Sequence, residues 1–105
     1  MLSYKPLFSV LIFTYKNVKY LYDAIDSVLS QNYGNIELVV SDDGSDDFRV
    51  EEVQRYINEK KTNNITHFRI NKNKHNMGTV KHCNKMLRLF EGKYVKMLAG
   101  DDALN

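Results

Sequence analysis

The sequence predicts one α/β domain: a three-layer α/β/α, Rossmann-like fold around a mostly parallel sheet. Two observations predict it. Apolar runs of strand length alternate with segments whose apolar residues recur at helical spacing. The runs at residues 7–13 and 36–40 lack polar alternation, which is typical of strands buried on both faces. The 105 residues suffice for one domain with a modest core.

The first half of the chain predicts a strand–helix–strand unit. Residues 7–13 form its first strand. A helix follows from Val18, with Asn17 placed to cap it and residues 32–35 placed to stop it. Its buried stripe consists of Val18, Leu21, Ile25, Val28 and Leu29. Residues 36–40 form the second strand, and a right-handed crossover makes the two strands parallel.

The second half continues the alternation. After Ser45, a candidate helix cap, Asp46 and Asp47 suit the positive end of a helix. The buried face of that helix is spaced by Val50, Val53 and Ile57, and residues 58–64 end it.

Three further elements complete the predicted fold. Residues 65–70 form a short strand, placed at a sheet edge because it is more polar. Residues 71–78 form a polar loop long enough to be a binding loop. A helix over residues 80–90, in which Cys83 packs, leads to a fourth strand at residues 93–99.

Composition excludes several classes of protein. A net charge of +2 with scattered Lys and Arg gives no basis for nucleic-acid binding. The single cysteine, Cys83, excludes an intrachain disulfide and fits a reducing, cytoplasmic compartment. The longest apolar run, residues 7–13, is far too short to span a bilayer. Peripheral attachment of a longer protein to the inner face of a membrane stays open.

Polar residues follow three predicted strands: Thr14-Tyr15, Asp42-Asp43 and Asp101-Asp102. Turn chemistry alone explains the Asp42 to Ser45 stretch. However, parallel strands deliver their carboxyl ends to one edge of the sheet, where ligands bind in open α/β folds. Two strands that end in paired carboxylates therefore favour a ligand site over simple turns.

The missing motifs narrow the chemistry of that site. No Gly-x-Gly-x-x-Gly or Gly-Lys-Ser/Thr motif follows the first strand, which disfavours a dinucleotide fold or a phosphate-cradling loop. A hard divalent cation, Mg²⁺ or Mn²⁺, bound by carboxylate oxygen could instead neutralise a diphosphate. Zinc is disfavoured because the one Cys and three His show no ligand spacing.

Five segments in order resemble the family 2, A-type-fold nucleotide-sugar glycosyltransferases. They are residues 9–15 (SVLIFTY), residues 27–33 (SVLSQNY), residues 36–45 (IELVVSDDGS), Asn76-x-Gly78 with Asn84, and residues 92–95 (GKYV) leading into Asp101-Asp102. The resemblance covers the chain from about residue 8 to its last residue. It implies a transferase of polysaccharide or glycoconjugate biosynthesis, in which the donor would be a UDP- or dTDP-sugar.

The resemblance also implies roles for individual residues. Thr14 and Tyr15 would contact the base, with the tyrosine ring against the pyrimidine. Asp43 would accept a hydrogen bond from the ring N–H of uracil or thymine, whereas Asp42 is expected to be structural.

Three further site roles follow from the same resemblance. The loop with Asn76 and Gly78 would close over the donor. Asp101 would face the ribose or sugar, and Asp102 would bind Mn²⁺ or Mg²⁺, a Lewis acid that stabilises the departing nucleoside diphosphate.

The chain departs from the family pattern in places. Phe13 stands where proline is usual and Lys16 where asparagine is common, and His82-Cys83 stands where Ala-Arg is frequent. The family also continues past the metal motif into an acceptor-binding half, which supplies the carboxylate general base. That base is expected beyond Asn105, the last residue of this chain.

Residues 1–105 are accordingly expected to be an incomplete N-terminal, donor-binding half of a glycosyltransferase domain. No catalytic residue is assigned in this half, and alone it is expected to be inactive. The full-length enzyme would invert configuration while transferring sugar to a saccharide or lipid-linked acceptor. The truncated fragment is expected to self-associate through its exposed fourth strand or sheet face.

Two alternative functions remain at this point. A receiver-like phospho-acceptor domain also gathers acids and Mg²⁺ at strand ends, but it needs acids after the first strand, where this chain has Thr14-Tyr15. The second alternative is a non-catalytic module that keeps the fold. Retention of Asp43, Asp101 and Asp102 argues against it, because these positions contribute little to stability if the site is empty.

Overall fold

The computed structural model of the chain describes residues 6–16, 18–86, 88, 92 and 94–99. Seven elements follow one another in the order β-α-β-α-β-α-β. The elements are β1 (Phe8–Thr14), α1 (Val18–Leu29), β2 (Ile36–Asp42), α2 (Val50–Lys60), β3 (Ile65–Lys72), α3 (Thr79–Met86) and β4 (Tyr94–Ala99). This alternation is the one that the sequence predicts.

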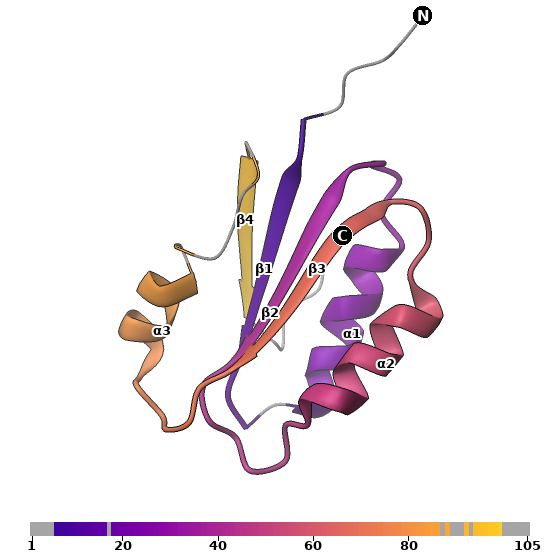
Figure 1. The fold of residues 1–105 in the computed structure, drawn as a ribbon. Helices are drawn as coiled ribbons and strands as arrows, with labels where there is room; N and C mark the ends of the chain where they lie inside the picture. Colours follow the sequence, from indigo (N-terminus) through magenta and orange to yellow (C-terminus); the bar gives the residue numbers. More distant parts are fainter. Residues whose placement is uncertain (1–5, 17, 87, 89–91, 93, 100–105) are drawn as a thin grey trace, which may run out of the picture.

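The four strands form one parallel sheet in the order β3-β2-β1-β4 (Figure 1). β1 pairs in register with β2, from Phe8 opposite Ile36 to Thr14 opposite Asp42. The carboxyl ends of β1 and β2 therefore lie side by side at one edge of the sheet. The predicted fold class is confirmed, and so is the edge position of the polar third strand.

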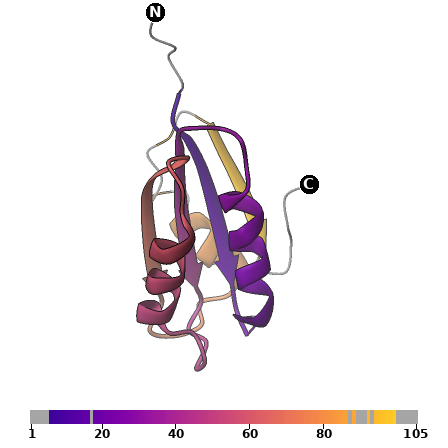
Figure 2. The same cartoon turned by 90° about the vertical axis from the view of Figure 1, so that its right-hand side faces the viewer.

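The helices lie in two layers. α1 and α2 cover one face of the sheet and α3 lies on the other face (Figures 1 and 2). Strand residues alternate between the faces. The larger core lies under α1 and α2, where strand residues such as Val10, Leu38 and Val40 meet the helix residues Ile25 and Ile57. Because both faces are covered, every residue of β2 is buried, as the sequence predicts for a central parallel strand.

The face toward α3 has a smaller apolar cluster and more polar contacts. Leu11 and Val39 form its buried centre. At the amino ends of the strands, the Ser9 hydroxyl donates to Glu37 Oε1 at 2.7 Å. The Gly92 N–H donates to the oxygen of the same hydroxyl at 2.9 Å, so Ser9 connects β1, β2 and the segment before β4.

Several predicted boundaries differ from the structure. α2 begins at Val50, so Asp46 and Asp47 are in the turn before the helix, and its first turn carries Glu51 and Glu52 instead. Ser45 does not cap α2 either. The turn after β2 continues to the buried Phe48, and only then does the helix begin.

Other boundaries differ less. β3 extends two residues beyond the predicted end to Lys72, which shortens the following loop. α3 is described to Met86, and the remainder of the predicted helix includes residues outside the described ranges. The predicted cap Asn17 also lies outside the described residues. No helix in the described part of the chain is long and apolar enough to cross a membrane.

Two loops pack closely at the carboxyl edge of the sheet: the turn at Gly44 after β2, and the loop between β3 and α3. Gly44 has a φ of +89°, and a Cβ there would lie 3.0 Å from the backbone N of Asn76 and from the backbone C of His75. Gly78 has a φ of +87°, but a Cβ there would meet nothing within 4 Å. The two glycines thus share a backbone conformation and differ in their surroundings.

We expect Gly44→Ala to lower the free energy of unfolding more than Gly78→Ala. Each variant places a Cβ in the left-handed region, at a cost of about 1–2 kcal/mol. Only Gly44→Ala also pushes a Cβ against neighbouring backbone, which cannot move aside as a flexible side chain can. Urea unfolding followed by circular dichroism measures both losses. Equal losses would contradict the close packing of the two loops.

Candidate functional site

The carboxyl edge of the sheet brings together residues from four segments. They are the ends of β1 and β2, the loop of residues 73–78, and the start of α3. The backbone N–H of Asp43 donates to the Thr14 carbonyl at 2.9 Å, which joins the ends of β1 and β2. The Asn73 N–H donates to the Asp42 carbonyl at 2.8 Å, which joins β2 to the loop after β3.

Asp42 closes the turn after β2. Its carboxylate accepts hydrogen bonds from the Ser45 N–H at 2.6 Å and from the Ser45 hydroxyl at 2.8 Å. Ser45 Oγ in turn accepts the Lys16 N–H at 2.7 Å, so the turn also holds the segment after β1. These bonds explain why Ser45 does not cap α2 and give Asp42 the structural role that the sequence predicts for it.

Asp43 is the most extensively bonded acid of the described site. Its Oδ1 accepts hydrogen bonds from Asn73 Nδ2 at 2.8 Å and from the Met77 N–H at 2.9 Å. Its Oδ2 accepts the Gly78 N–H at 3.0 Å. Asp43 is only 3% exposed. The structure therefore brings two of the predicted site residues, Asp43 and Gly78, into direct contact.

Hydrogen bonds keep the Asp43 carboxylate ionised. Burial raises the pKa of this carboxyl, but the bonds from Met77, Asn73 and Gly78, with the nearby His82, lower it by more. The net effect is a pKa below the ordinary value for aspartate. A carboxylate that remains charged at neutral pH is a hydrogen-bond acceptor only.

The end of β1 contributes three residues. Thr14 is buried, and its Oγ1 has no hydrogen-bond partner among the described residues. Tyr15 is 38% exposed, with Lys16 Nζ at 5.2 Å from the centre of its ring. Lys16 has a φ of +60°, the left-handed conformation in which asparagine is well tolerated and lysine is uncommon. Asparagine, which the resemblance leads one to expect at this position, tolerates this conformation better than lysine.

The loop residue Asn76 is placed less closely than Gly78. It is exposed, and its backbone packs on Gly44. No hydrogen bond from its side chain joins it to Asp43 among the bonds that the structure describes there, which come from Asn73, Met77 and Gly78. Its predicted contact with a donor stays a prediction.

The predictions for the end of the chain fall outside the described residues. Asp101, Asp102 and Asn105 are not described, although all three follow β4, whose carboxyl end lies at the same edge of the sheet. The expectation that the general base lies beyond Asn105 is likewise untested by this structure. The metal role of Asp102 and the sugar role of Asp101 stay predictions for the same reason.

The described acids do not form a metal site by themselves. No group of three His, Cys, Asp or Glu side chains within the described ranges is placed to bind a metal ion. Asp42 and Asp43 already accept several hydrogen bonds. A cation at this edge would therefore need further oxygen ligands, which residues 101–102 offer.

Sequence reasoning missed the polar side chains that surround Asp43. The sequence pattern places Asn71 and Asn73 only in a loop, and His82 stands out only as a departure from the family pattern. In the structure Ser41, Asn71, Asn73, His82 and Lys85 are connected by hydrogen bonds. The spacing of Asn71 and Asn73, two residues apart at the end of β3, was the available signal, since such residues lie on one side of an extended segment.

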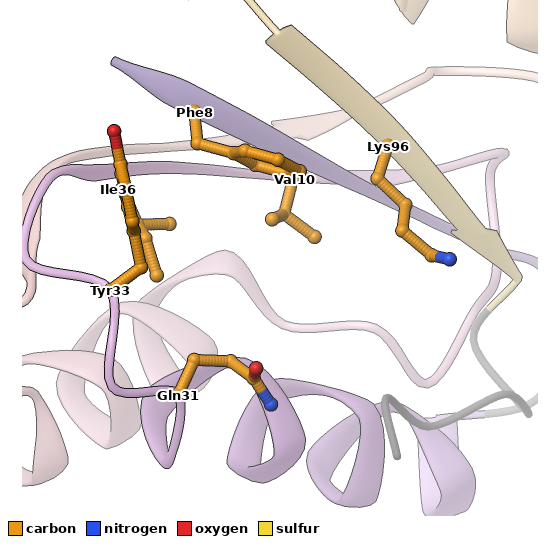
Figure 3. A pocket seen from close by; sticks show the side chains of 6 residues that line it. All are labelled: Phe8, Val10, Gln31, Tyr33, Ile36 and Lys96. Carbon is orange, nitrogen blue, oxygen red and sulfur yellow. The ribbon is translucent and has the colours of Figure 1, made fainter. Parts of the chain in front are cut away.

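A cavity of about 250 Å³ lies at the opposite end of the strands (Figure 3). Phe8, Val10 and Ile36 contribute most of its apolar wall, and Tyr33, Gln31 and Lys96 complete it. Phe8 and Ile36 are the first residues of β1 and β2, whereas Asp42 and Asp43 lie at the carboxyl end of β2. The cavity is therefore separate from the carboxyl-edge site.

Asp43→Asn is expected to lower the free energy of unfolding by about 1–3 kcal/mol at pH 7, because an amide N–H would face donors where the carboxylate now accepts. The lowered pKa also predicts an acid effect. The stabilisation is complete above the unfolded-state pKa of about 3.9 and is lost as pH falls further, through the folded-state pKa.

Urea unfolding of both proteins from pH 2 to pH 7 measures this difference, with the exposed Asp46→Asn as the matched control. The two stabilities should converge at low pH. A constant difference across the range would show that the Asp43 charge does not stabilise the fold.

Comparison with known proteins places this geometry in a family. An uncharacterized glycosyltransferase of Haemophilus influenzae is 32% identical over 97 residues, which cover 92% of this chain and 28% of that protein. TuaG of Bacillus subtilis, a glycosyltransferase named for teichuronic acid biosynthesis, is 30% identical over 102 residues, or 97% of this chain and 38% of TuaG. The chain thus spans well under half the length of these relatives.

Solved structures of two proteins show the same fold. Residues 1–349 of S. aureus TarS, solved with UDP, superpose with a TM-score of 0.77 and 30% identity over 93% of this chain and 28% of that one. The same TarS region was also solved with UDP-GlcNAc. The mannosyltransferase PcManGT of Pyrobaculum calidifontis, solved with GDP-Man and Mn²⁺, superposes with a TM-score of 0.80 over 96% of this chain and 29% of that one. Its identity is 22%, so this likeness shows the fold alone.

The sequence profile described as Glycosyl transferase family 2 matches residues 9–105. This range includes both the Asp42-Asp43 turn and the loop that binds Asp43. It also removes the receiver-like phospho-acceptor domain from consideration. The chain belongs to glycosyl transferase family 2.

Proposed function

We propose that this chain is the donor-binding portion of a glycosyltransferase that uses a UDP- or dTDP-sugar with a divalent metal ion. The observation that carries the proposal is the buried, ionised Asp43 at the carboxyl edge of the sheet, next to Thr14 and Tyr15. In open α/β sheets this edge is where nucleotides bind.

Asp43 is suited to recognise a ring N–H. A carboxylate has about four acceptor positions, and three of those on Asp43 accept hydrogen bonds in the structure. In the proposal, the fourth accepts the ring N–H of uracil or thymine. Cytosine presents an unprotonated ring nitrogen at the equivalent position, and two acceptors would then face each other. Asp43 therefore selects uracil or thymine over cytosine, because only the first two carry a proton on that ring nitrogen.

The neighbouring residues complete the proposed base site. Tyr15, exposed directly after β1, is proposed to offer its ring to the pyrimidine face, and Thr14 has a buried hydroxyl that no described group bonds. Gly78 donates to Asp43, which supports the proposal that the loop with Asn76 and Gly78 closes over a donor from the base side. The UDP and UDP-GlcNAc complexes of TarS, 30% and 29% identical to this chain, support a uridine donor.

The metal role is assigned to the end of the chain. We propose that Asp102 binds Mn²⁺ or Mg²⁺ and that Asp101 faces the ribose or sugar. Such an ion would offset the negative charge that develops on the departing diphosphate. The acidic oxygen donors fit a hard cation, and PcManGT, a neighbour in fold, was solved with Mn²⁺.

Catalysis itself is proposed to require more than this chain. Neither Asp42 nor Asp43 is a candidate general base, because both already accept hydrogen bonds. The relatives are longer, and we propose that segments equivalent to theirs, beyond Asn105, supply the acceptor site and the base. The chain alone is then inactive, and the complete enzyme inverts configuration at the sugar. A role in polysaccharide or glycoconjugate synthesis fits the naming of TuaG for teichuronic acid biosynthesis.

Binding experiments test the proposal. Isothermal titration calorimetry with UDP and Mn²⁺ is expected to give an affinity that depends on the metal. CDP is expected to bind at least about tenfold more weakly, because the hydrogen bond from the ring N–H to Asp43 is replaced by repulsion between two acceptors. Asp102→Ala should remove the dependence on Mn²⁺ and leave metal-free binding unchanged. Asp43→Asn should remove the preference for UDP over CDP.

The matched control is Asp46→Ala, an exposed acid in the same turn region. It should bind like the unmodified chain. Absence of binding to UDP, dTDP and GDP, with and without Mn²⁺, would identify the chain as a non-catalytic module of the same fold.

The same samples, examined by analytical ultracentrifugation, test the expected self-association, for which the exposed Tyr94 and Val95 of the edge strand β4 are the candidate surface.

A further inference from the structure

The buried histidine of α3 connects that helix to the sheet. His82 is 1% exposed, and its Nε2 lies 2.7 Å from Ser41 Oγ on β2. Its ring also makes an edge contact with Phe13 of β1, with the ring centres 6.2 Å apart. Phe13 and His82 are both departures from the family pattern, and in the fold they contact each other.

A chain of hydrogen bonds leads from His82 to Asp43. Ser41 Oγ accepts a hydrogen bond from Asn71 Nδ2 at 2.9 Å, and the same amide group donates to Asn73 Oδ1 at 3.1 Å. Asn73 Nδ2 then donates to Asp43 Oδ1 at 2.8 Å. Lys85 Nζ also donates to Asn73 Oδ1, at 2.5 Å.

The charges of Asp43 and Lys85 set the directions of the amide hydrogen bonds in this series. The Asp43 carboxylate can only accept and the Lys85 ammonium can only donate, so Asn73 must turn its NH₂ to Asp43 and its oxygen to Lys85. Asn71 must therefore donate with its NH₂ group to Asn73, and its second N–H donates to Ser41.

The same direction favours one protonation state of the histidine. Ser41 Oγ accepts from Asn71 and keeps its own hydroxyl proton, which it can donate to His82 Nε2 at 2.7 Å; we infer that it does so. The ring is then neutral and carries its proton on Nδ1. A protonated ring would donate from Nε2 and leave the buried Ser41 hydroxyl proton without its acceptor.

The charged groups around the ring bear on its titration. Burial lowers the pKa of His82, Asp43 and Asp42 of the β2 end raise it, and Lys85 of α3 lowers it, with a net lowering from the ordinary value. From β1, the contact is the uncharged Phe13. Protonation is therefore expected below the ordinary value of about 6.5. Because the folded-state pKa is the lower one, the stabilisation by neutral His82 is present above about pH 6.5 and is lost as pH falls.

We propose that neutral His82 is a positioning residue for the base-recognising carboxylate. By accepting the Ser41 hydroxyl proton, it holds Asn71 and Asn73 in the one orientation that presents an N–H to Asp43. Asp43 is thereby kept in place for a donor nucleotide, and donor binding becomes sensitive to protonation of His82. The proposal rests on the proposed function for its effect on binding, but not for its geometry.

The geometry is tested without nucleotide by NMR. Nitrogen shifts of the His82 ring should show the proton on Nδ1 at pH 7.5. The amide shifts of Met77 and Gly78, which bond Asp43, should follow the His82 titration. In His82→Gln, whose amide oxygen can accept the Ser41 proton, these amides should stay at their neutral positions across the same pH range. A proton on Nε2, or amides that ignore the His82 titration, would overturn the proposal.

The effect on binding is tested with UDP and Mn²⁺ in the same chain. His82→Gln should bind UDP within about twofold of the unmodified chain at pH 7.5, whereas His82→Ala should lose about tenfold, the effect of one unpaired buried hydroxyl. Affinity of the unmodified chain should fall as pH is lowered through the His82 titration that NMR locates, and it should stay level over the same range in His82→Gln. The exposed His75→Gln, in the loop next to Asn76, is the matched control and should keep the pH dependence.

The outcomes separate the two proposals. If UDP does not bind at all, the proposed function fails and the NMR titration still decides the geometry. If UDP binds with the same pH profile in His82→Gln as in the unmodified chain, the positioning role fails and the proposed function stands. If His82→Ala does not fold, the comparison of His82→Gln with His75→Gln remains decisive.

Discussion

The arrangement of the carboxyl edge depends on one buried negative charge. A carboxylate removed from water is strongly unfavourable unless hydrogen-bond donors replace its hydration. Around Asp43 these donors are two backbone N–H groups and one side-chain amide, all from the segment after β3. That requirement explains the close approach of this loop to the turn at Gly44, where no side chain fits, and the order of the amides between Asp43 and His82.

Much of the fold follows from hydrophobic pattern. Unbroken apolar strands at residues 7–13 and 36–40 require cover on both faces, and a helix at 18–29 between them requires a parallel crossover. These are local signals, and the structure confirms them. The predicted start of α2 was wrong because the sequence around Ser45 fits two hydrogen-bonded turns equally well. Only the position of Asp42, which bonds Ser45 from the preceding strand, decides between them.

The candidate site was predictable in outline and not in its interior. The strand ends alone indicated that Thr14, Tyr15 and Asp43 share an edge. Pairing between residues far apart in sequence, such as Ser41 with His82 or Asn73 with Asp43, leaves no periodic signal. The positive φ of Lys16 was likewise hidden, because lysine gives no indication of a left-handed backbone. The side chains that could not be predicted are therefore those connected only by contacts in the folded structure, such as Ser41 with His82.

The strand order has a consequence for how the chain folds. β2 pairs with β1 through residues that are close in sequence: Ser9 and Glu37, which share a hydrogen bond, are only 28 positions apart. The fourth strand must instead return to β1 across nearly the whole chain, since Gly92 bonds Ser9 from 83 positions away. Pairings of such long range slow folding, because the chain between them must be ordered first. During synthesis, β1 to β3 with α1 and α2 can therefore assemble while the β4 side of β1 is still open, and closure of that side completes the sheet last.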